Sequence, residues 1–419
     1  MRENNILNIA VVGHVDDGKS TLLGRLLYDT NHFSDDKIKL IKNFCRKNSR
    51  IFEYAFLIDA LKKEQAQGIT IDSARVFFRN ESKRYLFFDS PGHINFLKNM
   101  VTGASRADAA FIVIDASEGI RENSRRHGFL LSMLGIKKVI IVVNKMDLVE
   151  YDKNVFDSVS KEYSNFLRSI EIDVTTSIPV SALNGENVVA ASENMQWYRG
   201  KTVLKSIELF QEQTVNTKKP FRMPVQGVYK FTAFGDNKKI IAGSILSGKV
   251  QVGDEIVFYP SLKKSRIKEI VEFDKKGISE LTEGKAAGFT LEEQICIFRG
   301  ELAVSEKDSK PCVASRIRAS IFWLGKQPMV MGKKYIFKLG TSRVSVQVES
   351  IEKVCDAASF TEGIETKEIE NKMIAECVLK TEKPIAFDLI NEIKETGRFV
   401  IVDDYEISGG GIILKDMKD

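Results

Sequence analysis

Short apolar, β-branched runs alternate with longer amphipathic stretches between residue 6 and about residue 214. This alternation predicts βα units built around a largely parallel sheet. Because ligands of such folds bind at the carboxyl ends of the strands, the loops that follow the apolar runs are where we expect a site. These loops are rich in Gly, Pro, Asp or Asn. The expected buried strands are 6–12, 84–89, 109–115, 139–144 and 177–180.

The second half of the chain has a different pattern. After Pro220, short strand-like runs follow one another at hairpin spacing and are broken by glycine turns, such as the one at Gly253. The polar stretch 305–310 is typical of a linker, and a second series of strands begins near Pro311. We therefore expect an α/β phosphate-loop domain followed by two small antiparallel β-barrels. The expected boundaries are 1–216, 217–308 and 309–419.

The first expected strand runs into a phosphate-binding loop that fits GxxxxGK[ST]. Its glycines let the backbone curl, so that backbone N–H groups and the start of the following helix, expected from Thr21, surround a phosphate. Lys19 would neutralise the β- and γ-phosphates, and the Ser20 hydroxyl would bind Mg²⁺. A chance glycine-rich turn is the alternative, and the strand–loop–helix context argues against it. The loop consists of Gly13, His14, Val15, Asp16, Asp17, Gly18, Lys19 and Ser20.

A second phosphate loop follows the expected strand 84–89. Its Asp89 ends the strand, where a carboxylate can hold the Mg²⁺ shell from the other side. Gly92 has no side chain, so its N–H can approach a γ-phosphate closely. Asp89 as a simple turn cap is the alternative, and the presence of the first loop argues against it.

Two further loops predict selectivity for the base. Asn144 ends the expected strand 139–144, and Lys145 and Asp147 follow it. A fixed Asp147 carboxylate would accept hydrogen bonds from guanine N1–H and its 2-amino group. Adenine lacks both donors and would leave the carboxylate unpaired, so we expect it to be rejected. After the next strand, backbone N–H groups are expected to face guanine O6. They belong to Ser181, Ala182 and Leu183.

Three residues are candidates for the chemical step. Thr70 lies in the stretch 68–71 between the phosphate loops, where a mobile segment could bring its hydroxyl and carbonyl to Mg²⁺ and the γ-phosphate. His93 directly follows the second phosphate loop and is placed to orient an attacking water. Lys19 is the third candidate catalytic residue. The other histidines, at 14, 32 and 127, lack such a context and are expected to be structural or surface residues.

The ordered set of loops makes the N-terminal half resemble the translation-factor GTPases. The two β-rich blocks are similar to the second and third domains of elongation factor Tu, so the resemblance covers almost the whole chain. Within this class the chain most resembles the GTPase subunit of sulfate adenylyltransferase, or ATP sulfurylase. His14, where many sulfate-type subunits carry serine, and the stretch 93–100, which is close to the elongation-factor form, depart from that pattern. The stretches that carry the resemblance are 15–29 with its paired aspartates, 55–61, 64–70, 124–127, 134–137, 197–198, 242–248, 252–255 and 397–413.

The resemblance implies a division of labour. This chain would bind GTP or GDP with Mg²⁺ and hydrolyse GTP, while a separate catalytic subunit makes adenylyl sulfate and pyrophosphate from ATP and sulfate. Because sulfate adenylation is uphill, coupling to GTP hydrolysis through a conformational cycle would pull it forward. Some relatives carry a fused adenylylsulfate kinase, but no second GxxxxGK[ST] follows the expected barrels, so a kinase would be a separate partner.

Composition changes this picture only slightly. The net charge of +5 is small beside 62 basic and 57 acidic residues, which argues gently against nucleic acid as a partner. An aminoacyl-tRNA carrier is the main alternative. It would need a basic surface that binds the phosphates of tRNA, which the small net charge does not favour. A GTP-dependent scaffold without turnover is a third hypothesis, which the presence of Thr70, Asp89 and His93 argues against.

The cysteines and the absence of long apolar runs bear on location. No apolar run approaches the ~20 residues of a membrane span, and the first eight residues lack the apolar core of a secretory signal. We therefore expect a cytoplasmic protein. The cysteines are odd in number and form no CxxC pair, so they are expected to be reduced core thiols. They are Cys45, Cys296, Cys312, Cys355 and Cys377.

Overall fold

The structure is a computed structural model, and the chain divides into two compact units. Unit 1 covers Met1–Glu212, and unit 2 covers Gln213–Asp356 and Phe360–Asp419. The structure describes residues 6–47, 52–58, 74–80, 83–92, 107–210, 219–230, 239–272, 277–356 and 366–417.

Unit 1 is built on a six-stranded sheet of order β2-β3-β1-β4-β5-β6. Five strands are parallel, and β2 pairs antiparallel with β3 at one edge. All five predicted strands are present, whereas the edge strand β2 was not predicted. Strand β4 is buried along its whole length, as an apolar central strand of an α/β sheet should be. The strands are β1 Ile6–Gly13, β2 Ala74–Asn80, β3 Lys83–Asp89, β4 Ala109–Asp115, β5 Lys138–Asn144 and β6 Asp173–Pro179.

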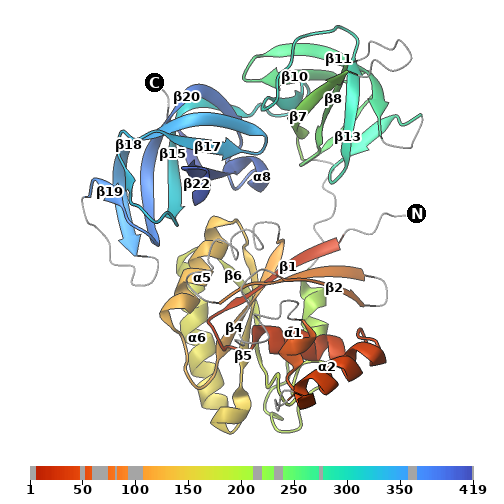
Figure 1. The fold of residues 1–419 in the computed structure, drawn as a ribbon, viewed down its shortest axis with the longest axis vertical. Helices are drawn as coiled ribbons and strands as arrows, with labels where there is room; N and C mark the ends of the chain where they lie inside the picture. Colours follow the sequence, from red (N-terminus) through yellow and green to blue (C-terminus); the bar gives the residue numbers. More distant parts are fainter. Residues whose placement is uncertain are drawn as a thin grey trace. The chain divides into compact units, whose positions relative to one another are not determined.

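Helices cover both faces of this sheet, with α1 on one face and α5 and α6 on the other (Figure 1). Alternate β1 residues explain the arrangement. Ile9 and Val11 belong to the core that includes Leu22 and Leu26 of α1, and burying each such side chain contributes about 1.5–3 kcal/mol. The helices are α1 Lys19–Asp29, α2 Asp35–Lys47, α5 Glu122–Met133, α6 Lys153–Ser169 and α7 Val203–Ser206, with short 3₁₀ turns η1 Tyr54–Leu57, η3 Met146–Val149 and η4 Ile207–Leu209.

Unit 2 holds two closed β-barrels, which confirms the predicted fold class. The first barrel is closed in the order β10-β11-β13-β8-β7-β14 and the second in the order β15-β20-β18-β17-β21-β22. The first barrel and its accessory strands are β7 Arg222–Lys230, β8 Lys239–Ser244, β9 Lys249–Gln251, β10 Glu255–Tyr259, β11 Lys263–Val271, β12 Glu280–Thr282, β13 Ala286–Leu291 and β14 Leu302–Ser305. The second comprises β15 Cys312–Trp323, β16 Met329–Val330, β17 Tyr335–Leu339, β18 Ser342–Asp356, β19 Glu368–Ile369, β20 Met373–Phe387, α8 Lys394–Gly397, β21 Arg398–Asp403 and β22 Glu406–Asp416.

A buried ion pair joins the two barrels of unit 2. Arg222, at the start of β7, lies 2.7 Å from Asp388, and the two side chains are 1% and 3% exposed. The guanidinium also donates to the carbonyls of Phe221 and Ser309, and the Thr396 hydroxyl donates to Asp388. Both charges are therefore compensated and hydrogen-bonded inside the junction, and this link was not predicted from the sequence.

The thiols only partly match the prediction of core cysteines. Cys45 and Cys377 are buried, and burial raises the pKa of Cys377 to about 12. Cys312 and Cys355 are half-buried, and Cys296 is exposed on the loop after β13, so the prediction was wrong for these positions. Among the helices of the described residues, none is long and apolar enough to cross a membrane.

Candidate functional site

The first phosphate loop connects β1 to α1 in the predicted strand–loop–helix arrangement. Asp16 and Gly18 both have left-handed backbone angles, with φ of 65° and 87°, and these two residues reverse the chain before α1 begins. A Cβ on Gly18 would lie 2.4 Å from Asn144 Nδ2, so glycine is required for the close approach of the loop to β5. The loop N–H groups and the α1 N-terminus are thereby held at the carboxyl edge of the sheet.

The charged groups inside the loop are buried. Lys19 is 6% exposed, and its Nζ donates to the His14 carbonyl at 2.6 Å. Burial lowers the pKa of Lys19, and the neighbouring Asp17 and Asp89 carboxylates oppose that shift. Burial removes water from the Lys19 ammonium, so this group is electrostatically suited to bind phosphate oxygens.

The second phosphate loop meets the first at the end of β3. The Ser20 hydroxyl donates to Asp89 Oδ2 at 2.6 Å, and Asp89 is fully buried. A Cβ on Gly92 would lie 2.6 Å from Lys19 Nζ, so Gly92 approaches the lysine without any room for a side chain. The structure thus brings together the hydroxyl and the carboxylate that the sequence assigns to Mg²⁺, both of which are oxygen ligands that this ion prefers.

Asn144, the last residue of β5, ties the phosphate loop to the base loop. Its Nδ2 donates to the Asp17 carbonyl at 2.8 Å, and its Oδ1 accepts the Ala182 N–H at 2.9 Å. The Ala182 N–H was expected to face guanine O6, and in the structure it donates to Asn144 instead. Asn144 is 2% exposed, so its role in the structure is to connect the two loops.

The expected base-binding face lies on the turn after β5. Lys145 pairs with Asp115 at 2.8 Å, while Asp147 is half-buried and has no hydrogen-bond or ion-pair partner among the described residues. Burial acts to raise the pKa of Asp115, but hydrogen bonds from Lys145 and Ser117 outweigh it and hold that pKa below its usual range. Leu183 is 57% exposed, although it follows the buried Ser181 and Ala182. An exposed leucine and a carboxylate without a partner among the described residues are both groups that suit a flat, hydrogen-bonding base.

Two of the predicted catalytic residues, Thr70 and His93, lie outside the described residues. Their roles stay predictions. Thr21, the remaining residue of the predicted phosphate site, lies in the first turn of α1.

His32 and His127 have no site-like geometry. The exposed His32 lies 2.9 Å from the Arg79 carbonyl through Nε2. His127 on α5 is 1% exposed, and neither of its ring nitrogens has a hydrogen-bond partner among the described residues. Burial lowers the pKa of His127 to about 3, and the positive charge of Lys19 adds to the effect. His127 is therefore a neutral core side chain, consistent with the structural role that the sequence predicted.

Comparison with known proteins identifies the class. Residues 4–213 match the family described as "Elongation factor Tu GTP binding domain", and residues 316–414 match "GTP-eEF1A C-terminal domain-like". Sulfate adenylyltransferase subunit 1 of Aeromonas hydrophila subsp. hydrophila is 37% identical over 99% of this chain and 87% of its own length. The chain belongs to the sulfate adenylyltransferase subunit 1 family of translation-factor-type GTPases. This result confirms the resemblance that the loops predicted, including the GTPase class of the enzyme.

Other similar proteins vary in how much of their own length matches. Bifunctional enzyme NodQ of Rhizobium sp. (strain BR816) is 37% identical over 95% of this chain, which spans 63% of NodQ. Among solved structures, sup35 complexed with GDP is 22% identical and covers 100% of this chain and 96% of its own, with a TM-score of 0.46. That score is too low to support any argument about this GTPase.

Two residues that shape the site were not predicted from the sequence. Asp115 ends β4, and the rule that placed Asp89 at the end of a strand could also have identified it. Arg25 on α1 donates to the Leu183 carbonyl at 2.8 Å and pairs with Asp29. No local signal predicts that contact, because Arg25 and Leu183 are 158 residues apart.

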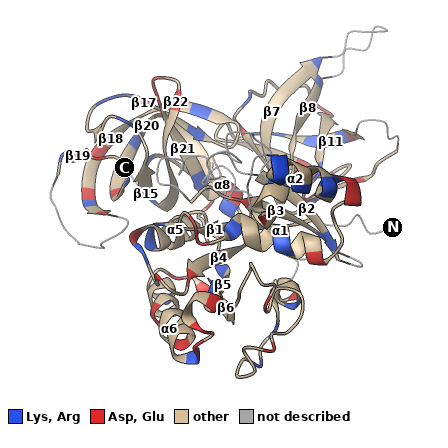
Figure 2. Cartoon of the chain, turned by 60° about the horizontal axis from the view of Figure 1, so that its bottom comes forward, with Lys and Arg blue, Asp and Glu red and all other residues tan. Residues whose placement is uncertain are grey.

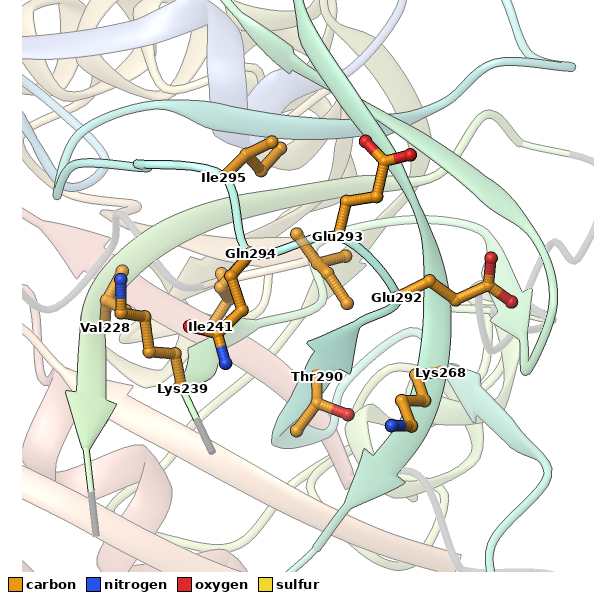
Figure 3. A pocket seen from close by; sticks show the side chains of 10 residues that line it. Val228, Lys239, Ile241, Lys268, Thr290, Glu292, Glu293, Gln294 and Ile295 are labelled. Atoms are coloured by element: carbon orange, nitrogen blue, oxygen red, sulfur yellow. The ribbon is translucent and has the colours of Figure 1, made fainter. Parts of the chain in front are cut away.

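A separate small hollow lies in the first barrel of unit 2 and contains none of these loop residues (Figure 3). It has a volume of about 100 Å³, and Ile241 and Leu291 are among its lining residues. Lys239, Lys268 and Glu292 also line it (Figure 3). Because both signs of charge surround it, the hollow does not specify one class of ligand.

Proposed function

We propose that this chain is the GTPase subunit of a sulfate adenylyltransferase. It hydrolyses GTP to drive the formation of adenylyl sulfate and pyrophosphate from ATP and sulfate on a separate catalytic subunit. The observation that carries this proposal is the likeness to sulfate adenylyltransferase subunit 1 of Aeromonas hydrophila along 99% of the chain. A name that specifies subunit 1 supports a heteromer in which the partner performs the adenylylation.

In this proposal the phosphate loop binds GTP or GDP through its backbone N–H groups and Lys19. Ser20 and Asp89, together with Thr70, hold Mg²⁺, which neutralises charge on the phosphates when it is bound. The short contact between the Ser20 hydroxyl and Asp89 Oδ2 supports this assignment, because it places two oxygen ligands side by side. His93 orients the attacking water.

Guanine selectivity depends in this proposal on Asp147 and on Leu183 at the end of the loop Ser181–Leu183, with Lys145 and Asn144 as supports. The Asp147 carboxylate, which has no partner among the described residues, and the exposed Leu183 support this assignment. We also propose that the chain comprises a GTP-binding domain over 1–216 and barrel domains over 217–308 and 309–419. A cytoplasmic location, where ATP and GTP are both available, belongs to the same proposal.

The charge distribution bears on the alternative of an aminoacyl-tRNA carrier. Figure 2 shows basic residues gathered on α2, whereas basic and acidic residues are interspersed along α6. A tRNA-binding function would use such a basic surface, and its affinity would fall steeply with salt. The test of the proposal therefore has to distinguish the two partners.

The test begins with a tagged chain that captures its partners from a native extract. The complex is then assayed for sulfate-dependent release of pyrophosphate from ATP, with and without GTP. We expect GTP to stimulate release several-fold in the wild-type complex and not in a Lys19→Ala complex, because the variant lacks the cation that binds the phosphates. Captured tRNA and ribosomal proteins without sulfate-dependent activity would instead favour the elongation-factor alternative.

A further inference from the structure

Asp17 is an anionic group inside a loop whose other polar groups suit an anion. Its side chain is almost fully buried, at 2% exposure for the residue. Oδ2 accepts the His14 N–H at 2.6 Å, and the Asp17 carbonyl accepts from Asn144 Nδ2. The Asp17 carboxylate therefore fixes the beginning of the phosphate loop and also adds negative charge to it.

The backbone of the loop dictates this inward position. Asp16 and Gly18, on either side of Asp17, both adopt left-handed angles, which turn the Asp17 side chain back toward the start of the loop. A Cβ on Gly13 would lie 3.1 Å from Asp17 Oδ2, which is a tight contact. The carboxylate is thus packed against the loop backbone rather than directed to solvent.

Charged and titratable groups face Asp17 from several of the elements around it. Lys19 on α1 and Arg121, just before α5, favour its ionised form, as does the hydrogen bond from His14. Asp115, at the end of β4, disfavours it, and Tyr163 on α6 lies within its electrostatic range. Burial outweighs the attraction of Lys19 and raises the pKa of the Asp17 carboxyl to about 6.

We propose that Asp17 tunes nucleotide affinity: its carboxylate shapes the loop, repels the phosphates, and takes up a proton when a guanine nucleotide binds. The inference rests on the assignment of this loop to nucleotide phosphates and does not depend on the sulfate-activating role. Asp17 acts through the loop and its charge, so it is a positioning residue rather than a catalytic one.

Two physical effects act in the same direction. Bound phosphates place further negative charge next to a buried carboxylate, which favours the protonated form of Asp17. In the free loop, Asp17 also stabilises the charge of the buried Lys19, so binding must replace that attraction with phosphate contacts. Removing the charge of Asp17 should therefore strengthen nucleotide binding at a pH where Asp17 is ionised.

The test measures GDP affinity by titration calorimetry at pH 6, 7 and 8 in the full chain with Mg²⁺. Asp17→Asn keeps an oxygen acceptor for the His14 N–H and removes the charge. We expect this variant to bind GDP about tenfold more tightly than wild type at pH 8 and within about twofold at pH 6, because a shift of one pKa unit corresponds to a tenfold change. Near pH 7, wild type should take up more protons on binding than the variant, as measured in buffers of different ionisation enthalpy.

Two further variants keep the test decisive. Asp157→Asn removes an exposed carboxylate from α6 and should leave the pH profile of wild type unchanged. Asp17→Ala removes the charge together with the acceptor, so it separates loop shape from charge. If Asp17→Asn binds GDP equally to wild type at pH 8, or more weakly by the same factor at every pH, the proposal is wrong. Failure of sulfate-dependent activity in the captured complex would leave these affinities unaffected, so the two proposals fail independently.

Discussion

Two buried charge networks of this chain differ in how completely their charges are compensated. At the barrel junction, Arg222 meets Asp388 through several hydrogen bonds, and backbone carbonyls together with Thr396 complete the network. In the phosphate loop, burial disfavours the charges of both Asp17 and Lys19. The junction is a network completed by its own residues, whereas in the loop burial still disfavours both charges, and an anionic ligand would compensate that of Lys19. Buried charge therefore stabilises one region and prepares the other for binding.

The two tryptophans allow the comparison to be tested region by region. Trp197 belongs to unit 1, where its Nε1 donates to the Tyr151 carbonyl. Trp323 is fully buried in the second barrel of unit 2. A Trp197→Phe background therefore reports unfolding of unit 2, and a Trp323→Phe background reports unfolding of unit 1.

The largest effect is expected at the junction. Arg222→Ala leaves Asp388 buried without its counter-ion, so we expect the free energy of unfolding of unit 2 to fall by about 3–5 kcal/mol. Urea unfolding followed by Trp323 fluorescence measures this loss. Replacing both partners, as Arg222→Met with Asp388→Leu, should recover most of it, because no unpaired charge remains.

An exposed pair of the same unit is the matched control for that prediction. Lys249 and Glu280 lie 2.8 Å apart with side chains 42% and 34% exposed. Lys249→Ala should cost less than about 1 kcal/mol, because solvent screens the pair. Equal losses in Lys249→Ala and Arg222→Ala would show that burial does not set the strength of the junction.

The next effect concerns binding more than stability. Lys19→Ala should weaken GDP binding about 100-fold, because a buried charge-assisted contact to the phosphates is lost. The unfolding of unit 1, followed by Trp197 fluorescence, should change far less than that of unit 2 in Arg222→Ala, since the lowered pKa of Lys19 shows that folding already disfavours its charge. Lys42→Ala on α2 is the control for loss of an exposed positive charge. Unchanged GDP affinity in Lys19→Ala would contradict the assignment of the phosphate loop.

The difference between the two networks also explains what the sequence could predict. The phosphate loop, Asp89 and Asn144 each end or follow a predicted strand, and parallel strands bring their carboxyl ends to one edge of a sheet. Local pattern therefore sufficed to assemble most of the site. Arg222 and Asp388 are 166 residues apart on two separate barrels, and nothing near either residue indicates the other.

The direction of a side chain within a correctly predicted loop was a second feature that the sequence did not predict. The sequence placed Asp17 among the phosphate-binding residues, but its side chain turns inward because Asp16 and Gly18 adopt left-handed angles. The edge strand β2 was missed for a related reason. Its exposed and buried residues alternate, so it lacks the continuous apolar run by which the parallel strands were identified.

The smallest expected effect tests the loop by its stability. Because the pKa of Asp17 is raised to about 6 in the folded chain, the folded state binds a proton more tightly than the unfolded state, whose carboxyl has a pKa near ~3.9. Stability is therefore lost as pH rises from about 4 through 6, and the loss is complete above about pH 7. Asp17→Asn has no such loss, so at pH 8 it should make unit 1 about 2–3 kcal/mol more stable than wild type, and the gain should shrink as pH falls through 6. Urea unfolding of the Trp323→Phe background between pH 5 and pH 8 measures the difference. If the increase in the free energy of unfolding of unit 1 does not vary with pH, the charge of Asp17 does not destabilise the folded loop. The contrast with the barrel junction would then rest on Lys19 alone.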